Sequence, residues 1–142
     1  MKKKVLIGSI ILVVLILVIL ITTWNIKPKG YKIIYHYIEN GSSQIPGSIE
    51  LETFYVKNDD HVIYFYKYYF DSSENLKKYS DYLTKSLNVS FQKIRIGEYE
   101  GLMDEKFGIG LIFEKDNILL LCSIKDIKID EGAVKWFLEN HF

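Results

Sequence analysis

The pattern of hydrophobic and polar positions divides the chain into a short apolar stretch and a longer patterned part. Residues 5–23 contain no charged residue, and three lysines precede them. At ~1.5 Å rise per residue, a helix of about 19 residues nearly matches the ~30 Å hydrocarbon core of a membrane. Within lipid, a single segment satisfies its own backbone groups as a helix. The sequence therefore predicts a transmembrane helix over residues 5–24, between a basic tail at residues 1–4 and a linker at residues 25–30.

The flanks of this stretch favour a retained anchor with a defined orientation. A cleaved secretory signal has a shorter apolar region of about 7–15 residues and small residues at its cleavage site, which this stretch lacks. Trp24 suits the membrane interface, where aromatic rings lie at headgroup level. More positive charge precedes the stretch than follows it at Lys27 and Lys29, which favours a cytoplasmic N-terminus. We therefore expect a single-pass protein of the cell membrane whose C-terminal domain, residues 31–142, is extracytoplasmic.

The C-terminal domain begins with a pattern typical of strands. Residues 31–39, 49–57 and 62–70 are rich in aromatic and β-branched residues, which favour strands. A polar loop at residues 40–48 separates the first two. Residues 58–61 are polar and short enough for a hairpin connection between the second and third.

The period then changes to that of an amphipathic helix. Asp71 followed by Glu74 fits a capping-box variant at the start of a helix. Apolar residues recur after it at spacings of three and four, which places them on one helical face. This stripe consists of Leu76, Tyr79, Leu83 and Leu87.

Strand character returns in the last third of the chain. Residues 89–96, 109–114 and 118–125 are predicted strands, with a turn at residues 97–101. Asp130 is predicted to cap a final helix. The apolar face of that helix comprises Val134, Phe137, Leu138 and His141. The order of elements indicates an α+β domain, in which a mostly antiparallel sheet carries two packed helices behind the transmembrane helix.

The second half of this pattern resembles the PsbP-like domain family and its membrane-anchored PsbP-related members. The resemblance is carried by the helix at residues 75–87, the IGEYEG turn at residues 96–101, the FEKDN hairpin at residues 113–117, and the terminal helix ending in Phe142. It implies an α/β/α sandwich without an active site that serves in protein association or assembly. Fold alone does not confer function.

Charge narrows the classes of partner. The formal net charge is zero, but no acidic residue occurs before Glu39, so residues 31–142 carry a net charge of about −5. Nucleic-acid binding needs clustered basic residues on one face. We therefore expect no nucleic-acid partner.

The candidate chemistry is sparse. The single cysteine, Cys122, alternates with apolar residues on a predicted strand and is interpreted as core. The three histidines, His36, His61 and His141, lie in a strand, a turn and a helix, which gives no nucleophile triad. Two acidic turns lack the spacing of a calcium loop. We predict no catalytic, cofactor-binding or metal-binding residues.

Tyrosines form the most informative pattern in the domain. They alternate along the first and third strands, with one more on the second strand between them. These residues are Tyr35, Tyr37, Tyr55, Tyr64, Tyr66 and Tyr68. The favoured interpretation is cross-strand packing beneath helices. The alternative is a partly exposed surface for a partner or a membrane, since tyrosine is enriched at interfaces.

These observations favour a single-pass, membrane-anchored and non-catalytic domain for binding or assembly. Its expected partners are the lipid bilayer, through residues 5–24, and another membrane or surface protein. The alternatives are a pilin-like structural subunit cleaved after Gly8, an enzyme of surface polymers, and a lipid-binding domain that uses the tyrosines. Asn40 and Asn88 match the N-glycosylation pattern and add little, because such matches occur by chance.

Overall fold

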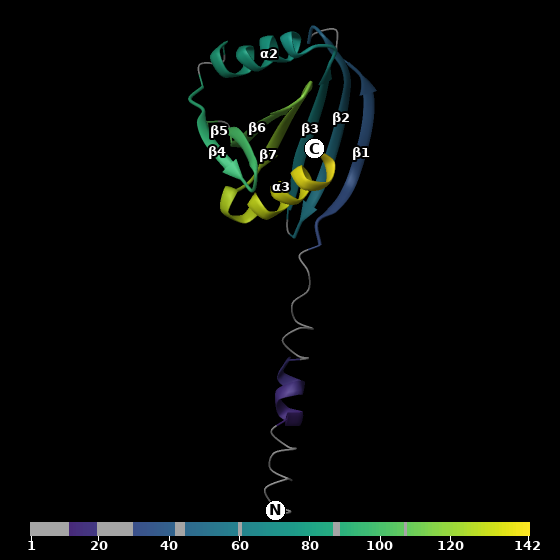
Figure 1. Cartoon of the computed structure of the whole chain (residues 1–142), viewed down its shortest axis with the longest axis vertical. Helices are drawn as coiled ribbons and strands as arrows, with labels where there is room; N and C mark the ends of the chain where they lie inside the picture. The colour runs from purple at the N-terminus through teal and green to yellow at the C-terminus, as the bar shows by residue number, and fades with distance from the viewer. Residues whose placement is uncertain (1–11, 20–29, 42–44, 60, 87–88, 107) are drawn as a thin grey trace, which may run out of the picture. The chain divides into compact units, whose positions relative to one another are not determined.

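The computed structural model describes residues 12–19, 30–41, 45–59, 61–86, 89–106 and 108–142. The chain divides into two compact units, Met1–Gly30 and Tyr31–Phe142. Each unit is described by itself below. Figure 1 shows the elements of both units in chain order.

The described part of the first unit is one short helix over residues 12–19. Among the described residues, no helix is long and apolar enough to cross a membrane. This finding contradicts the predicted transmembrane helix over residues 5–24. The same finding contradicts the single-pass topology and the membrane localisation that were derived from this helix. Trp24, the predicted interface residue, lies outside the described residues.

The second unit is built on one seven-stranded antiparallel sheet in the order β1-β2-β3-β7-β6-β5-β4. The strands are β1 (Lys32–Asn40), β2 (Ser48–Asn58), β3 (His61–Phe70), β4 (Gln92–Ile96), β5 (Tyr99–Asp104), β6 (Ile109–Lys115) and β7 (Ile118–Ile124). All but β5 overlap segments predicted as strands. Tight turns with positive φ at Asp59 and Asp116 close the β2–β3 and β6–β7 hairpins.

Strand β5 falls where the sequence predicted a turn over residues 97–101. The turn needs only Gly97 and Glu98, because Gly97 has a φ of 60°. Gly101 lies within β5, opposite Phe113 of β6. A Cβ atom on Gly101 would lie 2.7 Å from the Phe113 ring and 2.6 Å from the Ile112 carbonyl oxygen. The glycine that suggested a turn therefore provides room for an aromatic ring on a neighbouring strand.

We expect the substitution Gly101→Ala to lower the free energy of unfolding by about 1–3 kcal/mol, because a methyl group must push the Phe113 ring aside. Urea unfolding of the full-length chain measures this effect. Gly110→Ala on β6 is the matched control, since its Cβ atom would approach nothing more closely than 4.0 Å. Equal losses in the two variants would contradict the steric explanation.

The helices begin one or more residues away from the predicted caps. Helix α2 (Ser73–Asp81) starts after Ser72, whose hydroxyl accepts a hydrogen bond from the Asn75 amide. A π-helical turn, η1 (Tyr82–Ser86), follows it. Helix α3 (Ile127–His141) starts after Asp126, which accepts from the Lys128 amide. The caps predicted at Asp71 and Asp130 are therefore wrong.

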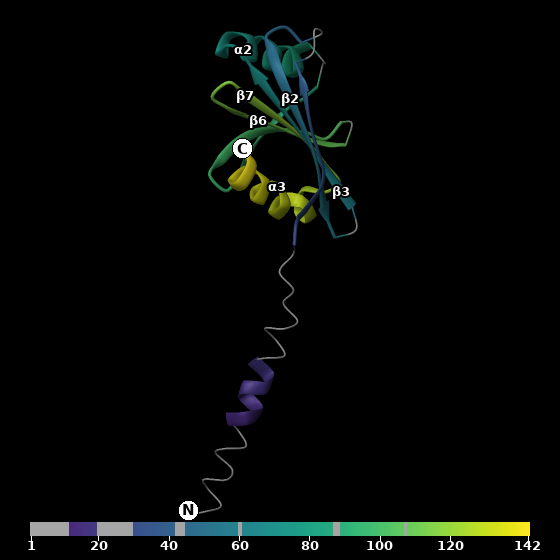
Figure 2. The same ribbon diagram turned by 90° about the vertical axis from the view of Figure 1, so that its right-hand side faces the viewer.

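The two helices pack on opposite faces of the sheet. Neighbouring β7 residues point to opposite sides, and Leu120 packs with α3 while Leu119 packs with α2. We call these sides the α3 face and the α2 face. Figure 2 shows the strands crossing between the two helices. The larger core, on the α3 face, contains Phe54, Val56, Ile63, Phe65, Ile96, Leu111, Phe113, Leu120, Cys122, Ile124, Ala133, Val134, Phe137 and Leu138.

Helix α2 covers only part of its face. The buried residues of its core are Phe70, Leu76, Ile112 and Leu119. Figure 1 shows α2 at one end of the central strands. The rest of the α2 face, on β1, β2 and β3, has no helix over it in the described part of the domain. That uncovered surface holds most of the tyrosines singled out in the sequence.

Candidate functional site

A row of tyrosine rings crosses β1, β2 and β3 on the α2 face. The Tyr35 and Tyr37 ring centroids are 6.5 Å apart, and Tyr35 stacks on Tyr55 at 4.7 Å. Tyr55 meets Tyr64 edge to face at 4.8 Å. Aromatic pairs at such distances attract one another. Tyr66 follows Tyr64 on the same face of β3, and together these five residues form what we call the tyrosine face.

Exposure divides the six predicted tyrosines into three exposed and three half-buried ones, the latter being Tyr55, Tyr66 and Tyr68. Tyr37 is 51% exposed, Tyr35 44% and Tyr64 38%. Tyr68 instead lies under α2, with its ring 5.8 Å from that of Tyr79. Burial raises the pKa of Tyr68 to about 12, with help from the nearby Tyr79 hydroxyl. The favoured interpretation of packing beneath a helix describes Tyr68, whereas the tyrosine face is partly open to solvent.

An apolar pocket of about 280 Å³ adjoins the tyrosine face at Tyr66. Leu83 of η1 and Phe91 form part of its wall, and Ile112 and Leu121 also line it. The pocket is large enough for one large apolar side chain of a partner. Sequence reasoning missed it, because its lining comes from five separate elements and from Phe91 before β4, and the local pattern does not reveal that they are adjacent.

A second, larger pocket of about 530 Å³ lies farther along the same face, over β4, β5 and β6. Its charged lining residues are Lys93, Arg95, Glu100 and Glu114. Glu114 accepts a hydrogen bond from the Ser80 hydroxyl of α2. Opposite charges line the pocket in equal number, so its electrostatics select neither an anion nor a cation.

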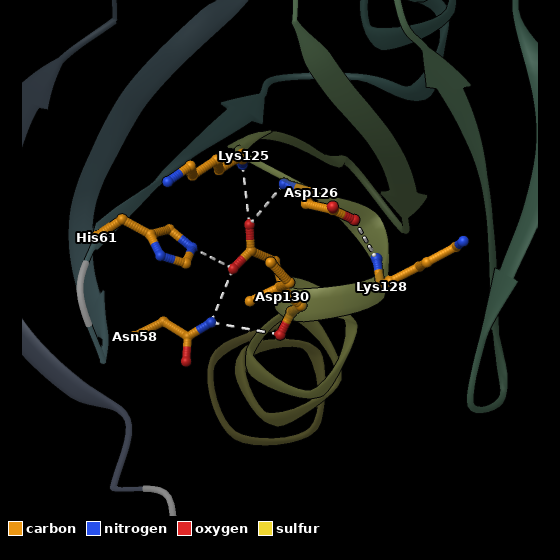
Figure 3. Close-up of polar contacts among 7 residues, drawn as sticks. Asn58, His61, Lys125, Asp126, Lys128 and Asp130 are labelled. Atoms are coloured by element: carbon orange, nitrogen blue, oxygen red, sulfur yellow. Dashed lines mark hydrogen bonds and ion pairs between the residues drawn. The ribbon is translucent and has the colours of Figure 1, made fainter.

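A buried carboxylate, Asp130, forms the most densely bonded polar cluster of the domain (Figure 3). Its Oδ2 atom accepts from the Lys125 and Asp126 backbone amides at 2.9 and 3.1 Å. Its Oδ1 atom accepts from the Asn58 side chain at 2.7 Å and contacts His61 Nε2. Burial alone raises the pKa of Asp130, but these hydrogen bonds outweigh it and lower the pKa below its usual range.

The Asp130 cluster connects three parts of the fold. Asn58 and His61 flank the β2–β3 turn, while the two amides lie between β7 and α3. A carboxylate that orients a histidine also occurs in catalytic dyads. In this cluster, however, no hydroxyl or thiol among the described residues is bonded to His61. These hydrogen bonds hold the β2–β3 hairpin and the β7–α3 connection to the first turn of α3.

A second polar cluster lies on the α3 face. Glu52 accepts from the Tyr69 hydroxyl at 2.5 Å, bonds His36 at 3.0 Å and pairs with Lys67 at 3.9 Å. Lys67 is only 8% exposed, and its ammonium lies 5.2 Å from the centre of the Tyr69 ring. Burial lowers the pKa of Lys67. Glu52 thus has three partners, and these contacts stabilise the packing of β1, β2 and β3 on the α3 face.

The remaining candidate residues do not come together. Cys122 is buried, and burial raises the pKa of its thiol well above the usual value, so the reactive thiolate is disfavoured. Among the described residues, no group of three or more histidine, cysteine or acidic side chains could hold a metal ion. Asn40 ends β1 and is exposed, while Asn88 lies outside the described residues.

No protein-family model matches the chain, and searches of curated proteins and of solved structures found no match. The resemblance to the PsbP-like family therefore stays a prediction. The tyrosine face and its adjoining apolar pocket are the surface whose geometry suits binding best.

Proposed function

We propose that residues 31–142 form a non-catalytic binding domain that docks another protein on the tyrosine face. The observation that carries this proposal is the exposed row of Tyr35, Tyr37 and Tyr64, joined through Tyr55 and lying beside an apolar pocket. Interface hot spots combine large aromatic side chains with a pocket that excludes water. Tyrosine contributes a rigid apolar ring and a hydroxyl that can hydrogen-bond a partner.

The surface also indicates the chemistry of the partner. The pocket beside Tyr66 is lined mainly by apolar side chains, including Leu83, Phe91 and Leu121. A fitting partner presents one large apolar side chain for this pocket. It places polar groups around that side chain, where they meet the tyrosine hydroxyls. A protein surface or an extended peptide segment provides this combination.

Site-specific photocrosslinking tests the proposal. A photoreactive phenylalanine analogue replaces Tyr64, which lies two strands away from the sheet edge, in full-length chain produced in its own cells. Tyr82 is the matched control position, because it is a tyrosine 53% exposed on η1 and outside the tyrosine face. We expect one discrete protein adduct from position 64 and none from position 82. The same adducts from both positions, or none of protein size from position 64, would contradict the proposal.

The dissociation constants of the captured partner for purified variants then measure how much the tyrosine face contributes to binding. We expect Tyr35→Ser or Tyr55→Ser to weaken binding at least tenfold, because hot-spot truncations typically cost more than about 2 kcal/mol, or about thirtyfold. Tyr82→Ser should leave the dissociation constant unchanged. Equal losses in all three variants would indicate a general effect on the fold and would refute the assigned surface.

A further inference from the structure

We infer that the outer edge of β1 pairs with the same edge of a second copy of the chain, forming an antiparallel dimer with twofold symmetry. Strand β1 pairs only with β2 in the described sheet, so it forms one edge. Its nine residues contain neither proline nor glycine. Four large apolar or aromatic side chains are exposed on it: Ile34, Tyr35, Tyr37 and Ile38. A long edge strand of this composition is a template for another strand.

The bulge in β1 sets the register of this pairing. The ladder to β2 shifts between Ile33 and Tyr35, so Ile34 lies outside it. Of the residues that remain in the ladder, those from Lys32 to Glu39 are arranged symmetrically about His36, and Asn40 lies beyond them. A twofold axis through His36 pairs Lys32 with Glu39, Ile33 with Ile38, and Tyr35 with Tyr37 of the other copy. Opposite charges and like apolar residues therefore meet across the interface.

The faces of the sheet agree with this register. Directly opposite residues in an antiparallel pair point to the same side. Ile33 and Ile38 both point to the α3 face, since their β2 partners Val56 and Glu52 share that side. Tyr35 and Tyr37 both point to the α2 face, opposite Tyr55 and Thr53.

Neighbouring registers lose this match. A shift of one residue places Tyr35 opposite His36, although these side chains point to different faces. A shift of two residues in one direction places Lys32 opposite Tyr37, and in the other direction it places Glu39 opposite Tyr35. Each of these shifts removes the charge complementarity and the pairing of isoleucines. The symmetric register is therefore the one that the strand itself favours.

The dimer extends the sheet and joins the two tyrosine faces side by side. Closed twofold dimers are the commonest protein oligomers, and their interfaces are self-complementary in this manner. The inference does not depend on the proposed function, because it concerns the edge of β1 and requires no partner protein. The crosslinking position at Tyr64 in β3 is two strands away from this edge. A negative result in the photocrosslinking test therefore leaves the dimer test unaffected, and the reverse also holds.

A cysteine placed on the twofold axis tests the register. Opposite Cα atoms in an antiparallel pair are about 4.5–5.5 Å apart, within the ~4.4–6.8 Å range of disulfides. We expect purified full-length His36→Cys to form a disulfide-linked dimer under mild oxidation, seen on a non-reducing gel. Ile38→Cys is the control on the same exposed face, because its two copies would lie ~13 Å apart in this register. The native Cys122 is buried in the wild-type chain, so we expect it to form no linkage in either variant.

We expect at least tenfold more linked dimer from His36→Cys than from Ile38→Cys. Adding Lys32→Glu to His36→Cys places like charges opposite each other twice and should reduce linkage several-fold. Adding Glu39→Lys as well restores the complementarity and should restore linkage. Equal linkage at positions 36 and 38, no linkage at position 36, or no recovery in the charge swap would overturn the inference.

Discussion

Replacing Phe137 with alanine should lower the free energy of unfolding by about 3–5 kcal/mol, the range for removing a buried aromatic ring. Phe137 is fully buried and lies in the C-terminal half of α3. Its ring stacks on Phe65 with centroids 3.9 Å apart and meets Phe54 edge to face at 5.1 Å. The substitution removes ring contacts to β3 and β2 at once. It also leaves a cavity between α3 and the sheet, which cannot move together enough to fill it.

Denaturant unfolding of the full-length chain, followed by circular dichroism, measures this loss. Glu139→Ala is the matched control, because Glu139 is an exposed residue on the same helix. We expect the control to change the free energy of unfolding by less than ~0.5 kcal/mol. A small effect of Phe137→Ala would mean that α3 contributes little to the core of the domain.

Replacing Asp130 with alanine should lower the free energy of unfolding by on the order of 3 kcal/mol. The substitution leaves the Lys125 and Asp126 amides and the Asn58 side chain without their acceptor. A buried donor left unsatisfied costs about 1–3 kcal/mol, and losses within one network do not add fully. Asp126→Ala in the same turn is the comparison, because it removes only a helix cap, a loss of about 1 kcal/mol.

The pH dependence of stability provides a second measurement on Asp130. Its pKa in the folded state is lower than the usual value, so its stabilisation is present above the usual pKa of about 3.9. That stabilisation disappears as pH falls through the lower folded value. We expect the free energy of unfolding of the wild-type chain to decrease more steeply below pH ~4 than that of Asp130→Asn. Parallel profiles would show that Asp130 is not the group responsible.

Local pattern predicted much of the sheet because alternation and turn residues are encoded over a few positions. The short polar connection at residues 58–61 indicated the β2–β3 hairpin in this way. Gly101 misled the assignment because a glycine signals a turn and a close approach equally well, and only the Phe113 ring distinguishes them. The apolar stretch at residues 5–23 predicted a membrane span, whereas no helix among the described residues is long and apolar enough to cross a membrane.

The candidate site was harder to predict because it depends on which part of the sheet α2 covers. Alternation placed Tyr64, Tyr66 and Tyr68 on one face, but the position of α2 decides which of them are exposed. Lys67 could have been found, since it alternates with Ile63 and Phe65 and must point to the same side. The role of Asp130 depends on residues about 70 positions earlier in the chain, and no local signal contains that information.

The strand order also has a consequence for folding kinetics. Every strand pairing except that of β3 with β7 joins consecutive strands. Two local meanders can therefore form quickly, while their junction must wait for closure of a long loop. Helix α3 follows all seven strands in the chain and contacts strands of both meanders. During translation, the nascent chain cannot complete the packing of this domain until α3 has left the ribosome.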